Sequence, residues 1–227
     1  MLRIVWWGHA CFELIHEGKR LVIDPHDGGS IAVNLPPPRT KADYVLVTHP
    51  HYDHDAVETV SKEGTAIVRT REGEFQLGPF RVKGIRLPHD EFEGRVRGMI
   101  TAYLIEAGPF SVLHLGDLGR PLTEREIESI GSPDIVLVPV GGVYTLHPAD
   151  ALESVTKIGA RIVVPMHYWF PGCQLPLEPL EIFLHHARRL RVVRLESNQL
   201  ELRKRDDLPP ETTVVVFKIP VEEKGPK

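Results

Sequence analysis

The run His49-Pro50-His51-Tyr52-Asp53-His54 constrains this chain more than any other feature, because it places four ligand-type side chains within six residues. It directly follows the apolar run from Asp43 to Thr48, which is typical of a strand covered on both faces. At this composition the pattern His-x-His-x-Asp-His arises by chance in roughly one or two chains in a thousand. A solvated loop could also carry four polar side chains, but the spacing favours a metal site at the end of a buried strand.

The spacing within this run predicts two neighbouring ions. His49 and His51 lie two residues apart in extended backbone, so their imidazoles project to the same side and can chelate one ion. Asp53 and His54 lie one turn further on, where the chain bends into a helix predicted from Asp55 to Lys62. We therefore expect this second pair to point toward a second ion.

The rest of the chain predicts two packed sheets with helices outside them. Short strand-like runs occupy residues 2–6, 11–15, 20–23, 66–69, 80–87 and 99–106 of the first half. In the second half, predicted helices at 123–130, 148–158 and 178–190 alternate with strands at 111–115, 135–138, 162–164, 192–195, 200–203 and 213–219. A sandwich accommodates this mixture better than one doubly wound sheet. We expect a single domain over residues 1–220 and a frayed charged tail over 221–227.

Composition excludes several other classes of protein. With 42% hydrophobic and 26% charged residues, the chain is neither disordered nor fibrous. Its net charge of -4 argues against a non-specific nucleic-acid binder. Its two cysteines, Cys11 and Cys173, are too few for a disulfide scaffold and are expected to be free thiols. Because no signal-peptide pattern and no apolar stretch of about 20 residues occurs, we expect a cytoplasmic protein without a membrane span.

These motifs resemble those of the metallo-β-lactamase superfamily. The run from His49 to His54 matches the HxHxDH signature, and the family's other motifs follow in order across almost the whole chain. Asp24 resembles the aspartate of the first motif, and His89 the third metal histidine. The segments 114–117 and 164–168 resemble those that carry the bridging aspartate and the last metal histidine. The resemblance implies an α/β (α+β) fold, the four-layer αββα sandwich, with the site at one edge between the sheets.

Within the superfamily, three segments look most like the branch that contains L-ascorbate-6-phosphate lactonase. They are Gly8-His9-Ala10, Pro139-Val140-Gly141-Gly142 and Pro165-Met166-His167-Tyr168. This branch suggests a phosphorylated sugar lactone as the substrate.

The resemblance also implies a ligand set. It assigns three histidines to one ion, three side chains to the other, and a carboxylate that bridges them: His49, His51 and His89; Asp53, His54 and His167; Asp117. Asp53 and Asp117 would then be the catalytic carboxylates. Because all these ligands are nitrogen or oxygen, the two divalent ions fit Zn²⁺ best, with Mn²⁺ or Fe as alternatives. His89 could otherwise be an ordinary loop histidine.

Further residues are candidates for supporting roles. Asp24 would accept the free imidazole N–H of a metal histidine and fix its orientation, although a carboxylate can also simply cap a turn. His9 could support the pocket in the same way or be an ordinary turn histidine. We expect one wall of the substrate pocket to bind a phosphate or carboxylate through residues near a predicted helix N-terminus and beside His167: Gly141, Gly142, Thr145, His147 and Tyr168. Turn geometry alone would also explain the two glycines.

Taken together, the sequence predicts a dinuclear metal-dependent hydrolase that uses a metal-bridging hydroxide on a small lactone, ester or phosphoester. The expected partner is a small, anionic substrate, and a homo-oligomer remains open. A phosphodiesterase acting on nucleotides or lipids is the enzymatic alternative. A metal-binding protein without turnover is the alternative from another class.

Overall fold

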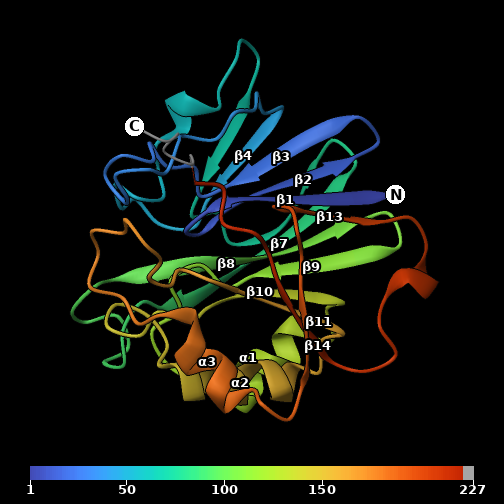
Figure 1. Ribbon diagram of the computed structural model, residues 1–227. Coiled ribbons are helices and arrows are strands. Elements are labelled where there is room, and N and C mark those ends of the chain that lie inside the picture. The colour runs from blue at the N-terminus through green and yellow to red at the C-terminus, as the bar shows by residue number, and fades with distance from the viewer. Residues whose placement is uncertain (222–227) are drawn as a thin grey trace.

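Two β-sheets pack face to face in the computed structural model, which describes residues 1–221 (Figure 1). The six-stranded sheet has the order β13-β1-β2-β3-β4-β5, with bounds β1 Leu2–Gly8, β2 Cys11–His16, β3 Lys19–Ile23, β4 Tyr44–Val47, β5 Ala66–Arg69 and β13 Gln199–Leu202. The eight-stranded sheet has the order β12-β14-β11-β10-β9-β8-β7-β6, with bounds β6 Gly73–Leu77, β7 Phe80–Pro88, β8 Met99–Ala107, β9 Phe110–His114, β10 Ile135–Pro139, β11 Ile162–Met166, β12 Arg191–Arg194 and β14 Thr213–Val216. The expected sandwich is confirmed.

The hydrophobic core lies between the two sheets. Ile4 and Trp6 of the six-stranded sheet belong to the same buried cluster as Tyr103 and Val112 of the eight-stranded sheet. Strand side chains alternate between faces, so each strand contributes every second residue to this layer. Burial of this apolar surface is the main force that holds the sheets together.

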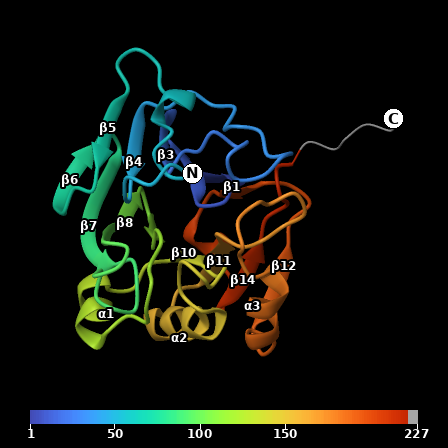
Figure 2. The same cartoon turned by 90° about the vertical axis from the view of Figure 1, so that its left-hand side faces the viewer.

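Three helices cover the outer face of the eight-stranded sheet: α1 Glu124–Ile130, α2 Pro148–Ile158 and α3 Leu180–His186 (Figure 2). The capping box of Thr123 and Glu126 begins α1, and the left-handed Gly159 ends α2. The predicted third helix was too long, since Glu178 pairs with the backbone of Gly141 and Trp169 instead.

The outer face of the six-stranded sheet is covered differently. The helix predicted from Asp55 to Lys62 is wrong: only the 3-10 helix η1, Val57–Thr59, forms there. The hydroxyl groups of Thr59 and Ser61 donate to nearby backbone carbonyls, and such local bonds compete with a regular helix. Loops and η1 therefore pack on this face around a small cluster that includes Val45 and Val60.

Other expectations of the sequence meet the structure as follows. Strand β6 was missed, although Phe75 and Leu77 alternate with polar residues. A second 3-10 helix, η2, spans Arg205–Asp207. Both cysteines are free thiols, as expected. Within residues 1–221, no helix is long and apolar enough to cross a membrane. Most of the predicted tail at 221–227 lies outside the described residues.

Strand direction brings four loops to one edge of the sandwich. Strands β9, β10 and β11 run parallel, and β7 has the same direction because both it and β9 pair antiparallel with β8. The loops after β4, β7, β9 and β11 carry His49, His89, Asp117 and His167. The fold therefore gathers side chains that are far apart in the sequence.

Candidate metal centre

Asp117 lies at the centre of a cluster of buried histidines. Its Oδ2 atom is 3.3 Å from Nε2 of both His54 and His167, 3.5 Å from Nε2 of His89 and 3.7 Å from Nε2 of His49. The carboxylate is 3% exposed, so these contacts are almost fully shielded from water. One carboxylate oxygen thus faces four imidazoles that come from three different loops.

The cluster contains two adjoining groups of possible ligands. His49, His51 and His89 form one group, and His9, Asp53, His54 and His167 form the other, while a third set, Asp24, His49 and His54, overlaps both. In the first group, Nε2 of His89 lies 3.3 Å from Nδ1 of His51. Every metal ligand inferred from the sequence lies either in one of these groups or, for Asp117, between them.

The spacing of these atoms fits coordination of metal ions. Two donors bound at 2.0–2.2 Å to one tetrahedral ion lie roughly 3.3–3.6 Å from each other, which is close to the distances around Asp117. Among the described residues, Nε2 of His49, Nε2 of His54 and Oδ1 of Asp117 are buried without a hydrogen-bond partner. Buried polar atoms normally have partners, so these three are explained by cations that would bind in the cluster.

Asp24 orients two of the histidines. Its Oδ2 accepts the Nδ1–H of His54 at 2.8 Å and the hydroxyl of Thr48 at 2.7 Å, and its Oδ1 accepts the Thr48 backbone N–H at 2.7 Å. The Thr48 oxygen in turn lies 3.0 Å from Nδ1 of His49. Since each Nδ1 is used as a donor, Nε2 of His54 and of His49 keeps its lone pair for a metal.

His9 supports the second group. Its Nε2 donates to Oδ2 of Asp53 at 3.0 Å, and the centroid of its ring lies 4.0 Å from the centroid of the His167 ring. The side chain is completely buried. His9 therefore fixes the orientation of Asp53, and it is also close enough to be a ligand.

The charges in the cluster favour bound cations. Burial lowers the pKa of His49 to about 3, which keeps the imidazole neutral and able to bind a metal. Burial alone would also lower the pKa of His54, but the carboxylates of Asp117, Asp53 and Asp24 outweigh it and raise that pKa well above the usual value. Three buried carboxylates around one imidazole leave an excess of negative charge, which bound divalent ions would neutralise.

The backbone of the site is strained in a way that the sequence did not reveal. His9, Asp24 and His167 have φ values of 51°, 49° and 53°, in the left-handed region that such residues rarely adopt. Gly141 packs closely against His167 and holds its backbone in this conformation. A Cβ at Gly141 would lie only 2.0 Å from the carbonyl oxygen of His167. Strain of this kind is concentrated at functional sites.

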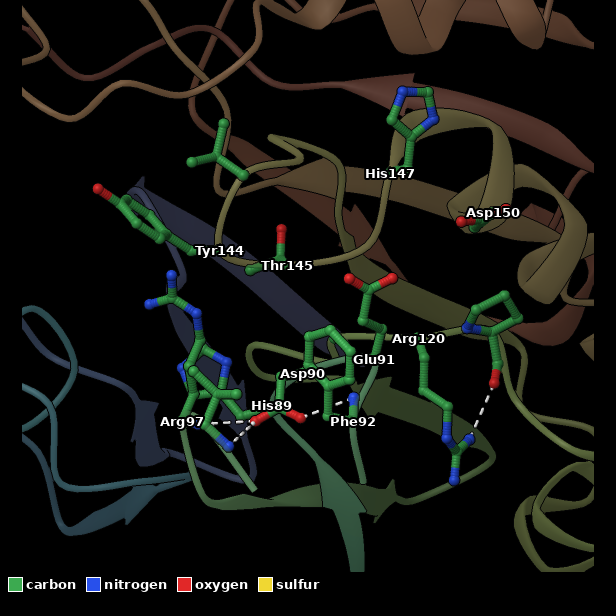
Figure 3. A pocket seen from close by; sticks show the side chains of 14 residues that line it. His89, Asp90, Glu91, Phe92, Arg97, Arg120, Tyr144, Thr145, His147 and Asp150 are labelled. Atoms are coloured by element: carbon green, nitrogen blue, oxygen red, sulfur yellow. Dashed lines mark hydrogen bonds between the residues drawn. The ribbon is translucent and has the colours of Figure 1, made fainter. Parts of the chain in front are cut away.

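A cavity of about 280 Å³ opens onto the cluster, and it adjoins a second cavity of about 450 Å³. Both are lined by His89, Arg97 and Tyr144. Figure 3 shows the second cavity, with Tyr144 and Arg97 on one side. Arg97 and Tyr144 were not singled out from the sequence, since neither belongs to a motif and only the fold brings them to the cluster.

The residues of the predicted substrate wall take different positions. Thr145 and His147 line the second cavity, and Nδ1 of His147 accepts the Ala149 N–H at the start of α2. Gly141 and Gly142 lie behind this wall, packed against His167 and Glu178.

Tyr168 lies away from both of these cavities. Its ring is buried in the core with its centroid 5.7 Å from that of Trp6. Strand β11 ends at Met166, and the left-handed backbone of His167 is followed by a Tyr168 side chain that joins the hydrophobic core.

Comparison with known proteins places these features in context. Residues 3–167 match the family model described as the β-lactamase superfamily domain. A UPF0173 metal-dependent hydrolase of Thermoplasma acidophilum is 32% identical over 188 residues, covering 74% of this chain and 83% of that protein. One from Thermococcus onnurineus is 32% identical over 204 residues, covering 78% and 90%.

A solved structure agrees in both sequence and fold. It is a Thermotoga maritima protein named for a Zn-dependent hydrolase of the metallo-β-lactamase superfamily, and it is 34% identical with a TM-score of 0.77. The match covers 96% of this chain and 100% of that one. These three names state no substrate, so the resemblance to the lactonase branch stays a prediction.

Proposed function

Because this chain belongs to the metallo-β-lactamase superfamily, and within it to the UPF0173 family of metal-dependent hydrolases, we propose that it hydrolyses a small ester, lactone or phosphoester with two divalent ions that share Asp117. The observation that carries the proposal is the position of the Asp117 Oδ2 atom, 3.3–3.7 Å from the Nε2 atoms of four histidines. A carboxylate in this position faces histidines of both groups and would help to hold both ions.

The proposed ligands divide as the two groups suggest. His49, His51 and His89 would hold one ion, and Asp53, His54 and His167 the other. Bound divalent ions supply Lewis acidity, which lowers the pKa of water toward neutrality and stabilises negative charge on the oxygen of the bond that breaks. Zinc suits this set of imidazoles and carboxylates, as it does the Thermotoga protein by its name.

The remaining residues of the chain hold these ligands in place. Asp24 and Thr48 keep the Nε2 atoms of His54 and His49 directed at the cluster, and His9 keeps Asp53 directed there. Burial of the cluster excludes bulk water on all sides except the cavity of about 280 Å³. A rigid, shielded arrangement of this kind is what electrostatic stabilisation of a transition state requires.

The substrate enters through this cavity, which has the size for a small molecule. A phosphorylated sugar lactone fits the resemblance to the lactonase branch, and small phosphodiesters are the competing class. The cavity volumes of about 280 and 450 Å³ favour a small molecule over a polymer.

Turnover of a defined panel tests the proposal. Protein with bound metal is assayed on δ-valerolactone, 4-nitrophenyl acetate and bis(4-nitrophenyl) phosphate, before and after treatment with a chelator. We expect hydrolysis of at least one compound that the chelator abolishes. Asp117→Ala should reduce kcat/KM by at least about 100-fold, since loss of a ligand exceeds the 10- to 100-fold effect of losing its supports.

Asp55→Asn is the matched control, because the Asp55 carboxylate pairs with Nε of Arg69 at 2.9 Å rather than with the cluster. It should retain the activity of the unmodified chain. Metal-loaded protein that hydrolyses none of the three compounds, or an Asp117→Ala variant as active as the Asp55→Asn control, would contradict the proposal.

A further inference from the structure

Arg97 lies at the junction of the two cavities beside the metal cluster. It lines the cavity that opens onto Asp117 and also the larger cavity that Figure 3 shows. Its guanidinium stacks over the ring of Tyr144, 4.6 Å from the ring centroid. Stacking of this kind holds a planar cation in one place while its N–H groups remain available.

The loop that carries Arg97 is held by Asp90. The buried Asp90 carboxylate accepts four backbone N–H groups, from Phe92, Gly94, Val96 and Arg97, at 2.7–3.0 Å. The loop from His89 to Gly98 therefore folds around one carboxylate. Because the backbone N–H of Arg97 is one of the four, its position relative to His89 is fixed.

Arg97 differs from the other arginine of these cavities in having no acidic partner. Arg120 lines the larger cavity but forms salt bridges with Glu93 at 2.6 Å and Glu126 at 2.9 Å, so its charge is neutralised. Within residues 1–221, no carboxylate forms a salt bridge with the Arg97 guanidinium. Arg97 is thus the arginine beside the cluster whose charge remains available to a ligand.

The acidic residues of the larger cavity limit where an anion can bind. The Asp90 carboxylate is occupied by its four backbone donors, and Glu91 and Asp150 also line this cavity. Asp150 lies with His147 across the pocket from Arg97 in Figure 3. An anionic group is therefore favoured on the side of Arg97 and Tyr144, next to the metal cluster.

We propose that Arg97 binds a carboxylate or phosphate group of the substrate and so gives the enzyme a preference for anionic esters or lactones. This inference rests on the proposed hydrolase function and names its substrate class. The guanidinium can form two parallel hydrogen bonds with either oxyanion, and Tyr144 holds it in the orientation for doing so. The anion lies outside the bond that breaks, so Arg97 acts in binding and not in the chemical step.

Two esters that differ only in charge test the proposal. They are mono-4-nitrophenyl adipate and its methyl ester, which has the same acyl chain without the carboxylate. For the unmodified chain we expect KM for the anionic ester to be roughly 5- to 30-fold lower, at the low end of what a hydrogen bond to a charged group provides, because Arg97 is exposed to solvent. Arg97→Ala should remove this difference by raising KM for the anionic ester, with kcat nearly unchanged.

Arg95→Ala is the matched control, since Arg95 is an exposed arginine of the same loop that lines neither cavity. It should behave as the unmodified chain does, and Arg97→Lys should keep part of the preference. Replacing the carboxylate by a phosphonate at the same chain length shows which anion is preferred. Equal KM values for the two esters, or equal behaviour of Arg97→Ala and Arg95→Ala, would overturn the proposal.

Calorimetric binding of adipate to the unmodified chain, Arg97→Ala and Arg95→Ala separates this inference from the proposed function. If no ester is hydrolysed, the hydrolase proposal fails on these substrates, but adipate should still bind more weakly to Arg97→Ala than to Arg95→Ala. Equal adipate affinities would overturn the role of Arg97 whether or not the esters turn over.

Discussion

Replacing Asp24 by Asn will weaken metal binding although Asp24 lies outside the proposed set of ligands. The Asp24 carboxylate is completely buried and accepts three hydrogen bonds, two from Thr48 and one from Nδ1 of His54. An amide of the same shape has one oxygen and one NH₂ group. Whichever way it is oriented, its NH₂ group faces at least one donor that previously had an acceptor.

The magnitude follows from these contacts. A buried donor that loses its acceptor costs about 1–3 kcal/mol, so the metal-free variant should lose about this much free energy of unfolding. Loss of the carboxylate behind His54 also makes its Nε2 a poorer and less well oriented ligand. Changes to such supports typically reduce metal affinity 10- to 100-fold.

Competition with a chelating dye measures the affinity, and urea unfolding of the metal-free protein measures stability. Asp27→Asn serves as the control, because Asp27 is exposed and, among residues 1–221, its carboxylate accepts hydrogen bonds only from the nearby Ser30. We expect the affinity of Asp24→Asn to fall by one to two orders of magnitude while the control stays unchanged. The reasoning is refuted if the two variants bind metal equally well.

Three further outcomes are expected. Gly141→Ala should lower metal affinity, because its methyl group would lie 2.0 Å from the His167 carbonyl oxygen. In Gly29→Ala the added methyl group meets nothing within 4 Å, so this control should keep its metal affinity, and dye competition compares the two variants. Tyr168→Phe should leave KM unchanged on any substrate found, while Tyr168→Ala should cost about 3–5 kcal/mol in urea unfolding because the ring packs against Trp6. Removing the metal should lower Tm, since an ion present at 100 times its Kd stabilises the fold by about 2.7 kcal/mol; calorimetry with an unchanged Tm would contradict this.

The sequence predicted the strands well because their signal is local. Apolar runs bounded by turn residues gave Ala66–Arg69 its observed bounds and placed β7 and β11 so that His89 and His167 follow their ends. The predictions failed where contacts between distant residues determine the local structure. The stretch after Asp55 forms only η1, and α3 begins after Pro179 because Glu178 is paired with other loops.

The residues of the candidate site also fall into those that the sequence could predict and those that it could not. Its histidines and aspartates stand at strand ends, so their convergence could be expected from motifs in the chain. Thr48, Arg97 and Tyr144 could not be found from the sequence, because their roles come from residues 24 to 47 positions away along the chain.

Elemental analysis of the purified chain and of two variants tests the central claim most directly. After reconstitution and dialysis, we expect two metal ions per chain, and about one in each of His89→Ala and His167→Ala, because these histidines belong to different groups. A single ion per unmodified chain, or the loss of all metal in one variant and none in the other, would contradict a pair of ions that share Asp117.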